Sequence, residues 1–206
     1  MDDKPIPDII IGRLPIYLLA LQHFIKEGRQ VTSSKELGER LGISPAQIRK
    51  DLSQFGEFGK QGTGYDIPFL LEQLRLILKV DRVWDIAVVG VGDIGHAVAG
   101  YQGFADRGFR VKLLFDKDPA KIGEQVGNFV VQDSANLVEV IKEAGIKVAM
   151  IAVPASEAQA VAQQLVQAGV KAILNYAPIN LNLPSEVHVQ YIDPLLHLQR
   201  MSYYLI

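Results

Sequence analysis

A glycine-rich motif follows the short apolar segment 86–89 and offers the clearest chemistry in the chain. Its members are Gly90, Val91, Gly92, Asp93, Ile94 and Gly95. In this G-x-G-x-x-G spacing the first glycine makes a tight turn, the second lets a pyrophosphate approach the backbone, and the third lets the following helix pack on the strand. The free N–H groups and the dipole of that helix favour an anion. The motif therefore predicts a pyrophosphate site.

An acidic residue completes this pattern. Asp116 ends the next apolar segment, 111–115, at the distance where a dinucleotide-binding fold places the acid that holds the adenosine ribose. Because its carboxylate would repel a 2′-phosphate, the pair predicts NAD(H) rather than NADP(H), although the neighbouring Lys117 is a cation that would tolerate such a phosphate. Two alternatives stay open: glycines kept only for packing, and coenzyme A as the ligand.

Two further strand ends carry apolar residues and prolines, and neither contains an acid. The candidate cofactor-binding residues there are Val153, Pro154, Ala155, Asn175, Ala177 and Pro178. Ligands of open parallel sheets lie beyond the carboxyl ends of the strands. An apolar pocket penalises the cationic oxidised nicotinamide through desolvation, so we expect NADH to bind better than NAD⁺. The alternative is that the prolines merely end strands.

Signs of catalysis or metal binding are weak. The histidines His23, His96, His188 and His197 fall into no Ser-His-Asp, H-E-x-x-H or Walker pattern. No substrate domain follows the glycine motif, and the chain has no cysteine for a disulfide, a zinc–thiolate site or a thiol switch. We therefore expect a protein that is not an enzyme and holds no metal, with a small NAD-dependent oxidoreductase as the alternative.

The first part of the chain predicts a helix-turn-helix. Ser33 with Glu36 and Ser44 with Gln47 each fit a capping box, and only Gly42-Ile43 separates the two helices that these boxes begin. Ile48, Leu52 and Phe55 would form the core face of the second helix.

The opposite face of that helix carries side chains that hydrogen-bond bases and phosphates, and the glycine-rich segment after it predicts a hairpin, or wing. The candidate DNA-binding residues are Ser44, Gln47, Arg49, Lys50 and Ser53 on the helix and Lys60 and Tyr65 on the wing. Together they predict contact with double-stranded DNA. The alternative is an ordinary solvated helix face with a surface hairpin.

These features imply an α/β chain in three parts. Residues 1–80 read as a winged helix-turn-helix domain, residues 81–193 as a Rossmann-type doubly wound parallel sheet, and residues 194–206 as an amphipathic C-terminal helix. The expected strands are 86–90, 111–115, 129–131, 148–153, 172–175 and 187–192, with helices at 95–107 and 156–168 among the segments between them.

The bulk composition is that of an ordinary globular protein: 206 residues, 49% apolar, 21% charged and a net charge of −2. Any basic DNA-binding surface must therefore be local. The acidic start, Met1-Asp2-Asp3, does not suit a signal peptide, and no uninterrupted apolar run is long enough to span a membrane. We expect a cytoplasmic protein without a membrane partner, whose response to redox state would need a bound cofactor.

Several motifs spread over the whole chain resemble the Rex family of redox-sensing repressors. They include the segment from Gln47 to Ser53, Phe58-Gly59-Lys60, Phe115-Asp116-x-Asp118-Pro119, Val153-Pro154-Ala155 and Asn175-Tyr176-Ala177-Pro178. The resemblance implies a cytoplasmic homodimer that binds operator DNA when NADH is scarce and releases it when NADH, the effector, accumulates. It also implies that the C-terminal helix crosses to the partner subunit, whereas the sequence alone would equally allow packing on its own chain.

Departures from the family pattern are small. The family usually has Asn where Asp93 stands, and a carboxylate there would weaken pyrophosphate binding unless it faces away. Tyr176 replaces a common Phe, and Pro194 follows Asp193.

Position and resemblance together suggest Arg13, Tyr101 and Asp193 as the polar set that couples NADH binding to DNA binding. The alternative is that these are ordinary surface residues.

Overall fold

A computed structural model describes residues 6–60 and 62–205 and divides the chain into two compact units, Met1–Arg82 and Val83–Ile206. The sequence predicts this division after residue 80 and a separate C-terminal part, 194–206, whereas here that helix belongs to the second unit. The acidic start Met1-Asp2-Asp3, Gln61 of the wing and the final Ile206 lie outside the described residues.

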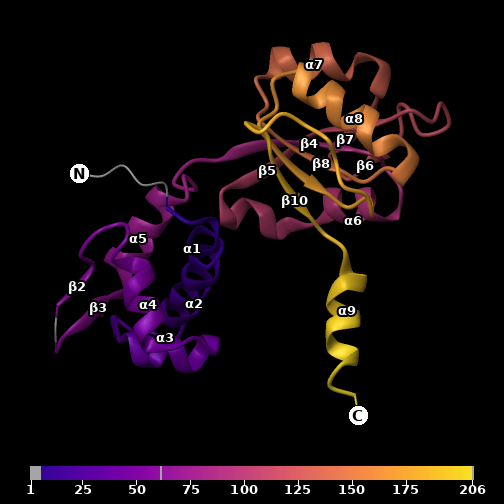
Figure 1. Ribbon diagram of the computed structural model, residues 1–206. Helices are drawn as coiled ribbons and strands as arrows, with labels where there is room; N and C mark the ends of the chain where they lie inside the picture. Colours follow the sequence, from indigo (N-terminus) through magenta and orange to yellow (C-terminus); the bar gives the residue numbers. More distant parts are fainter. Residues whose placement is uncertain (1–5, 61, 206) are drawn as a thin grey trace. The chain divides into compact units, whose positions relative to one another are not determined.

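The first unit combines helices with a small antiparallel sheet (Figure 1). Its helices are α1 (Asp8–Ile11), α2 (Leu14–Lys26), α3 (Ser34–Leu41), α4 (Pro45–Leu52) and α5 (Ile67–Ile77). Its strands are β1 (Val31–Thr32), β2 (Gly59–Lys60) and β3 (Gly64–Asp66), in the order β1-β3-β2. The β2–β3 hairpin is the predicted wing, and β1 is an additional strand that is too short to show a periodic pattern.

Local signals explain the helix-turn-helix. The Ser33 hydroxyl accepts a hydrogen bond from the Glu36 N–H while Glu36 reaches back to the Ser33 N–H, which confirms the first capping box. The second box is only half formed: Ser44 accepts from the Gln47 N–H, but the Gln47 side chain turns to another partner. Gly42 ends α3 with φ 67°, a conformation that suits glycine.

Close packing holds the two helices of this motif together. A Cβ added at Gly38 would lie 2.4 Å from the Ile43 carbonyl oxygen, so the turn needs a glycine there. Ile48 and Leu52 are buried as predicted, whereas Phe55 lies beyond the end of α4 and is only partly buried against the same core.

The second unit contains a twisted sheet with the strand order β10-β9-β8-β4-β5-β7-β6 (Figure 1). The strands are β4 (Trp84–Val89), β5 (Phe109–Asp116), β6 (Gln125–Val126), β7 (Phe129–Asp133), β8 (Val148–Ile151), β9 (Ala172–Asn175) and β10 (His188–Tyr191). All neighbours pair in parallel except β6, an edge strand antiparallel to β7 that the sequence did not predict. The predicted doubly wound parallel sheet is confirmed.

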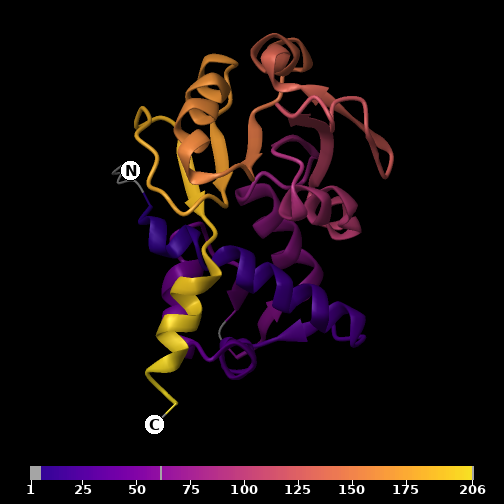
Figure 2. The same cartoon turned by 90° about the vertical axis from the view of Figure 1, so that its right-hand side faces the viewer.

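Both faces of this sheet are covered, as a continuously apolar central strand requires. On β4, Ile86 and Val88 point into a cluster with residues of α6 (Asp93–Gly100), while Ala87 and Val89 point into the cluster of α7 (Leu137–Ala144) and α8 (Ala155–Gln167). Figure 2 shows the same layers from the side. Strand β4 is therefore buried at the centre of the unit, and its carboxyl end carries the glycine motif.

One predicted helix is wrong in its extent. Instead of one helix over residues 95–107, α6 ends at Gly100 and a 3₁₀ helix, η1 (Gln102–Arg107), follows. Tyr101 has extended dihedrals between them, with ψ 112°. Its ring meets Phe104 edge to face, and a Cβ added at Gly103 would come within 2.4 Å of the Tyr101 hydroxyl oxygen.

The C-terminal helix α9 (Pro194–Ser202) extends away from β10 and contains no buried residue in the described chain (Figure 1). The exposed apolar side chains of α9 and of the residues that follow this helix are Leu195, Leu196, Leu198, Met201, Tyr203, Tyr204 and Leu205.

Among the described residues, the segment Asp8–Lys26 has the length and mean hydropathy of a membrane span. It comprises α1 and α2, and its apolar residues Leu14, Tyr17 and Leu21 are fully buried in the core of the first unit. Burial of this kind is typical of a core helix in a globular domain.

Candidate functional site

The carboxyl ends of the strands in the second unit surround a cavity of about 800 Å³. The predicted cofactor-binding residues that line it are Gly90, Gly92, Asp93, Ile94, Asp116, Lys117, Val153, Pro154, Ala155, Ala177 and Pro178. A cavity of this size is within the range of small-molecule and cofactor sites.

The three glycines have different surroundings. Gly90 has φ 96°, and a Cβ there would lie 2.5 Å from the Ala152 carbonyl oxygen. A Cβ at Gly95 would lie 2.0 Å from the Gly90 carbonyl oxygen, so the close packing of helix on strand requires glycine. Gly92 has no described atom within 4 Å of its Cβ position and precedes the first turn of α6, which has no side-chain cap among the described residues. The backbone is therefore open where an anionic pyrophosphate would fit.

Asp116 is buried at the end of β5 and already organises this site. One of its carboxylate oxygens accepts a hydrogen bond from the Val91 N–H at 2.7 Å, and the other accepts from the Asp118 N–H at 2.9 Å. Burial acts to raise the pKa of Asp116, but these N–H donors and the Lys121 cation outweigh it and hold the pKa below its usual value. Asp116 is thus an anion with acceptor capacity left for ribose hydroxyls.

The cation beside Asp116 differs from the one we considered in the sequence. The Lys121 ammonium lies 3.5 Å from the Asp116 carboxylate, whereas Lys117 pairs with Glu157 at 2.7 Å. A turn at Asp118, whose carbonyl oxygen accepts the Lys121 N–H, brings Lys121 back toward Asp116. No periodic pattern in the sequence marks this return.

Three predicted cofactor residues do not line the cavity but shape it. Val91 is buried and donates its N–H to Asp116, and Gly95 packs beneath the glycine turn. The buried Asn175 amide donates to the carbonyl oxygens of Ala177 and Ile179 and accepts from the Ala177 N–H. It fixes the loop in which Ala177 and Pro178 stand.

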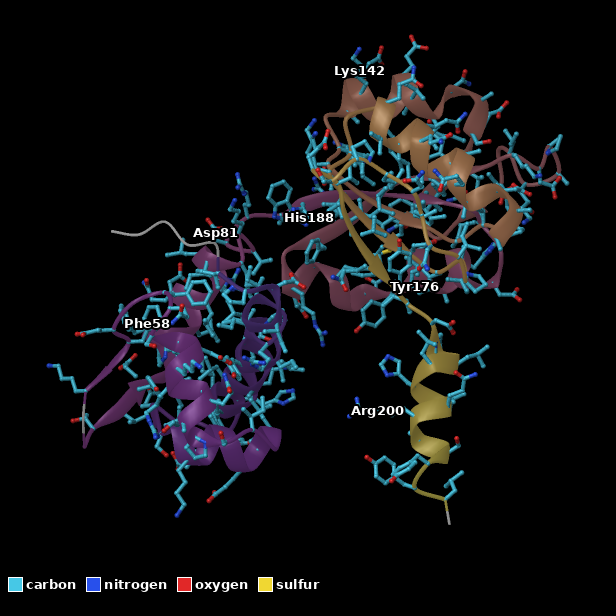
Figure 3. All side chains as sticks on the ribbon, in the orientation of Figure 1. Phe58, Asp81, Lys142, Tyr176, His188 and Arg200 are labelled. Atoms are coloured by element: carbon cyan, nitrogen blue, oxygen red, sulfur yellow. The ribbon has the colours of Figure 1, made fainter. Side chains whose placement is uncertain are left out.

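Other lining residues were not predicted. Polar groups reach the cavity from Asp118, Ser134, Ser156, Glu157 and Gln164. Tyr176, labelled in Figure 3, follows β9, and burial raises the pKa of its hydroxyl. The strand ends themselves are apolar as expected, but Glu157 adds an acid from the first turn of α8, neutralised by Lys117.

His96 and His188 lie outside this cavity lining. The His96 Nδ1 atom lies within hydrogen-bond distance of the Gly92 carbonyl oxygen, at 3.1 Å. His188 is exposed on the edge strand β10 (Figure 3). Over residues 6–60 and 62–205, no cluster of His, Asp and Glu suits a metal ion.

The second candidate site is the exposed face of α4 and the wing in the first unit. Arg49, Lys50 and Ser53 are exposed, as is Lys60 on β2. Arg49 donates to the Ser34 hydroxyl at 2.9 Å, which fixes its guanidinium at the start of α3. Arg49, Ser53 and Lys60 line a groove of about 1200 Å³ together with the wing, whereas Lys50 is not among its lining residues.

Tyr65 differs from its predicted place on the wing surface. It is 9% exposed, its ring belongs to the domain core, and a Cβ at Gly59 would lie 2.8 Å from that ring. Burial raises the pKa of its hydroxyl, against a smaller opposing effect of Arg49. The Tyr65 ring thus packs against the wing from the side of the core. Residue 59 must be glycine because a Cβ there would clash with this ring.

The three residues proposed for coupling have local roles in their own units. Arg13 forms a bidentate ion pair with Asp51 of α4, at 2.6 and 2.7 Å, rather than standing free. Tyr101 is half exposed beside Phe104, and the Asp193 carboxylate caps α9 by accepting the Leu195 N–H at 2.9 Å. Asp51 itself, on the buried face of α4, was not predicted as a site residue because its partners Arg13 and Tyr17 lie far away in the chain.

Comparisons with known proteins cover both units. The family model described as "CoA binding domain" matches residues 81–179, and the one described as "Putative DNA-binding protein N-terminus" matches residues 5–53. Proteins named "Redox-sensing transcriptional repressor Rex" are 52% identical in Chloroflexus aggregans (98% of this chain, 95% of that protein) and 42% identical in Brevibacillus brevis (98% of each).

Solved structures agree with these sequence matches. A structure of RSP in complex with β-NAD⁺ and operator DNA has a TM-score of 0.93 at 34% identity, covering 98% of this chain and 94% of that one. A structure of RSP in complex with β-NADH has a TM-score of 0.90 at 32% identity, covering 98% and 95%.

Proposed function

Because this chain belongs to the Rex family of redox-sensing transcriptional repressors, we propose that it binds operator DNA when NADH is low and leaves the DNA when NADH binds. The observation that carries the proposal is that one chain combines a helix-turn-helix with a glycine-framed cavity that contains a buried acid, Asp116. The glycine cradle at Gly92 and the buried Asp116 fit a dinucleotide and NAD(H) in particular.

The proposed cofactor site comprises the predicted glycine motif, Asp116 and the loops after β8 and β9, to which we add Lys121 and Tyr176. In the proposed DNA interface, Ser44, Gln47, Arg49, Lys50 and Ser53 face the major groove and Lys60 the backbone beside it. Tyr65 acts as a support for Lys60 rather than as a contact.

The proposed assembly is a cytoplasmic homodimer. Its support is α9, whose apolar side chains find no cover in the described chain and would be buried by a second copy. Two recognition helices on a symmetric dimer would read half-sites about 34 Å apart or a multiple of that distance. We further propose that the chain acts by binding alone and is not an enzyme.

For the switch we keep Arg13, Tyr101 and Asp193 as the proposed coupling set. NADH can release DNA only if the DNA-bound geometry binds NADH more weakly. Asp193→Asn tests the set sharply, because Asn also caps a helix but carries no charge. We expect this variant to bind DNA while losing its response to NADH; an unchanged response would exclude Asp193 from the switch.

The deciding experiment is fluorescence anisotropy of a protein–operator complex titrated with NADH at stated salt, with NAD⁺ as competitor. Release by NADH, opposed by NAD⁺, is the expected result. DNA binding that ignores NADH would contradict the proposal. Coenzyme A, the ligand in the description of the matching family model, belongs in the same titration as the alternative ligand.

A further inference from the structure

The helix α4, which carries the proposed DNA contacts, has a buried carboxylate on its inner face. Asp51 is 0% exposed, and its two oxygens accept four hydrogen bonds. Oδ2 accepts from the Arg13 Nε and the Tyr17 hydroxyl, each at 2.6 Å. Oδ1 accepts from the Arg13 Nη2 at 2.7 Å and from the Gln47 Nε2 at 2.6 Å. A carboxylate has about four acceptor positions, so Asp51 is saturated and has none left for a ligand.

This arrangement fixes the orientation of the Gln47 amide. Only an N–H group can face a carboxylate, so the nitrogen of Gln47 must point at Asp51 and its oxygen away from it. No other hydrogen bond of this side chain occurs within the described part of the chain. Gln47 therefore keeps one N–H and its Oε1 free.

Gln47 also has the right place for a base contact. It is the third residue of α4, directly after Pro45-Ala46, and is half exposed. The residues near the N-terminus of a recognition helix are those that reach base edges.

The free donor and acceptor of Gln47 match one base. Adenine presents an acceptor, N7, beside a donor, the N6 amino group, in the major groove. Guanine presents two acceptors there and would oppose the Gln47 oxygen with its own. The N–H that adenine uses lies on the same side as the amide oxygen, which leaves the other N–H for Asp51.

We propose that Gln47 reads an adenine in each half-site. Asp51, whose charge is neutralised by Arg13, is the positioning residue that fixes the orientation of the Gln47 amide. This inference rests on the proposed DNA-binding function and adds a base preference to it. It also assigns Arg13 a role within the first unit: its charge makes the buried carboxylate tolerable, because an unpaired buried charge is strongly destabilising.

The test is selection from a pool of randomised DNA duplexes with the full-length protein, followed by sequencing. We expect the wild type to prefer an A·T pair at one position of each half-site. Gln47→Ala should reduce that preference about tenfold or more at this position alone, the range expected for a bidentate contact. Gln73→Ala, a half-exposed glutamine on α5 of the same unit, is the matched control and should change no position.

Asp51→Asn tests the positioning role. An Asn at 51 can donate as well as accept, so the Gln47 amide is free to turn over, and the adenine preference should fall at the same position while the others stay. Tyr17→Phe keeps the carboxylate and its Gln47 contact and should retain the preference. If Asp51→Asn does not fold, Asp51→Ser replaces it, because a hydroxyl also donates and accepts and leaves the Gln47 amide free to turn over. Gln47→Glu tests the reading role instead: without an N–H for adenine N7, the adenine preference should fall.

The outcomes separate three failures. If the wild type selects no sequence, the DNA-binding function fails and this inference with it. If the wild type selects a motif but Gln47→Ala keeps every base preference, only the reading role fails. If Gln47→Ala loses the preference but a folded Asp51→Asn keeps it, the positioning role of Asp51 is wrong.

Discussion

At the scale of single residues, Asp116 does two tasks with one carboxylate. It accepts hydrogen bonds from the Val91 and Asp118 N–H groups, and in the proposed NAD(H) site its remaining acceptor capacity would hold the ribose. Asp116→Asn places an NH₂ group against one of these N–H donors, so we expect the Kd for NADH to rise at least about tenfold. Calorimetry measures this, with the exposed Asp106→Asn as control. An unchanged Kd would mean that the ribose is held elsewhere.

Asp93 should act in the opposite sense. It is exposed in the first turn of α6 and lines the cavity. Its negative charge would repel a pyrophosphate there, but it stabilises the N-terminus of the helix through the helix dipole. We expect Asp93→Asn to bind NADH about two- to fivefold more tightly at low salt, with a small loss of thermal stability. Equal affinities of the two proteins at low and high salt would contradict this expectation.

At the scale of elements, the ion pair between Arg13 and Asp51 joins the start of α2 to α4. Burial acts to raise the pKa of Asp51, but the hydrogen bonds from Arg13, Tyr17 and Gln47 and the Arg13 charge outweigh it and lower the pKa. The unfolded chain then takes up this proton first as the pH falls. The stabilisation is complete above the ordinary aspartate value of about 3.9 and is lost below it.

Thermal unfolding followed by circular dichroism between pH 6 and pH 3 measures this loss. The wild type should lose stability toward pH 3 more steeply than Asp51→Asn, whose amide does not titrate. Parallel curves for the two proteins would show that Asp51 contributes nothing to acid sensitivity.

The packing of α6 on β4 gives another prediction. A Cβ at Gly95 would lie 2.0 Å from the Gly90 carbonyl oxygen, and the obstacle is backbone that cannot swing away. Gly95→Ala should therefore destabilise the second unit by about 2 kcal/mol or more, and calorimetric unfolding measures it. Gly100→Ala, at the other end of the same helix with open space around it, should be close to neutral.

Elements with strong local signals could be predicted from the sequence. The capping residue Ser33, the glycine turn at Gly90 and the apolar strand β4 carry their own signals, so the helix-turn-helix and the parallel sheet were predicted. The break at Tyr101, whose ring packs on Phe104, and the edge strand β6, which pairs with β7 across a short turn, have local contacts but no periodic pattern that marks them. In the candidate sites, Asp116 follows a known motif and was predicted, whereas Lys121 returns to it through a turn without such a motif. Asp51 was missed because its partners Arg13 and Tyr17 lie far away in the chain.

At the scale of the whole molecule, the proposed homodimer depends on α9, whose apolar side chains are exposed. A variant ending at Asp193 removes it without touching a buried residue of α9 within the described chain. We expect this variant to be monomeric by analytical ultracentrifugation and to bind operator DNA more weakly, since two half-sites then act separately. A dimeric truncated protein would place the subunit interface elsewhere.

In the proposed homodimer, the exposed helix α9 also makes repression sensitive to the abundance of the protein itself. When a folded protomer is completed only by a second copy, dilution favours separate protomers with an uncovered apolar helix, and concentration favours the pair. Occupancy of the operator then depends on the square of the protomer concentration at low expression. A cell that lets the protein level fall would therefore lose repression steeply, whatever its supply of NADH.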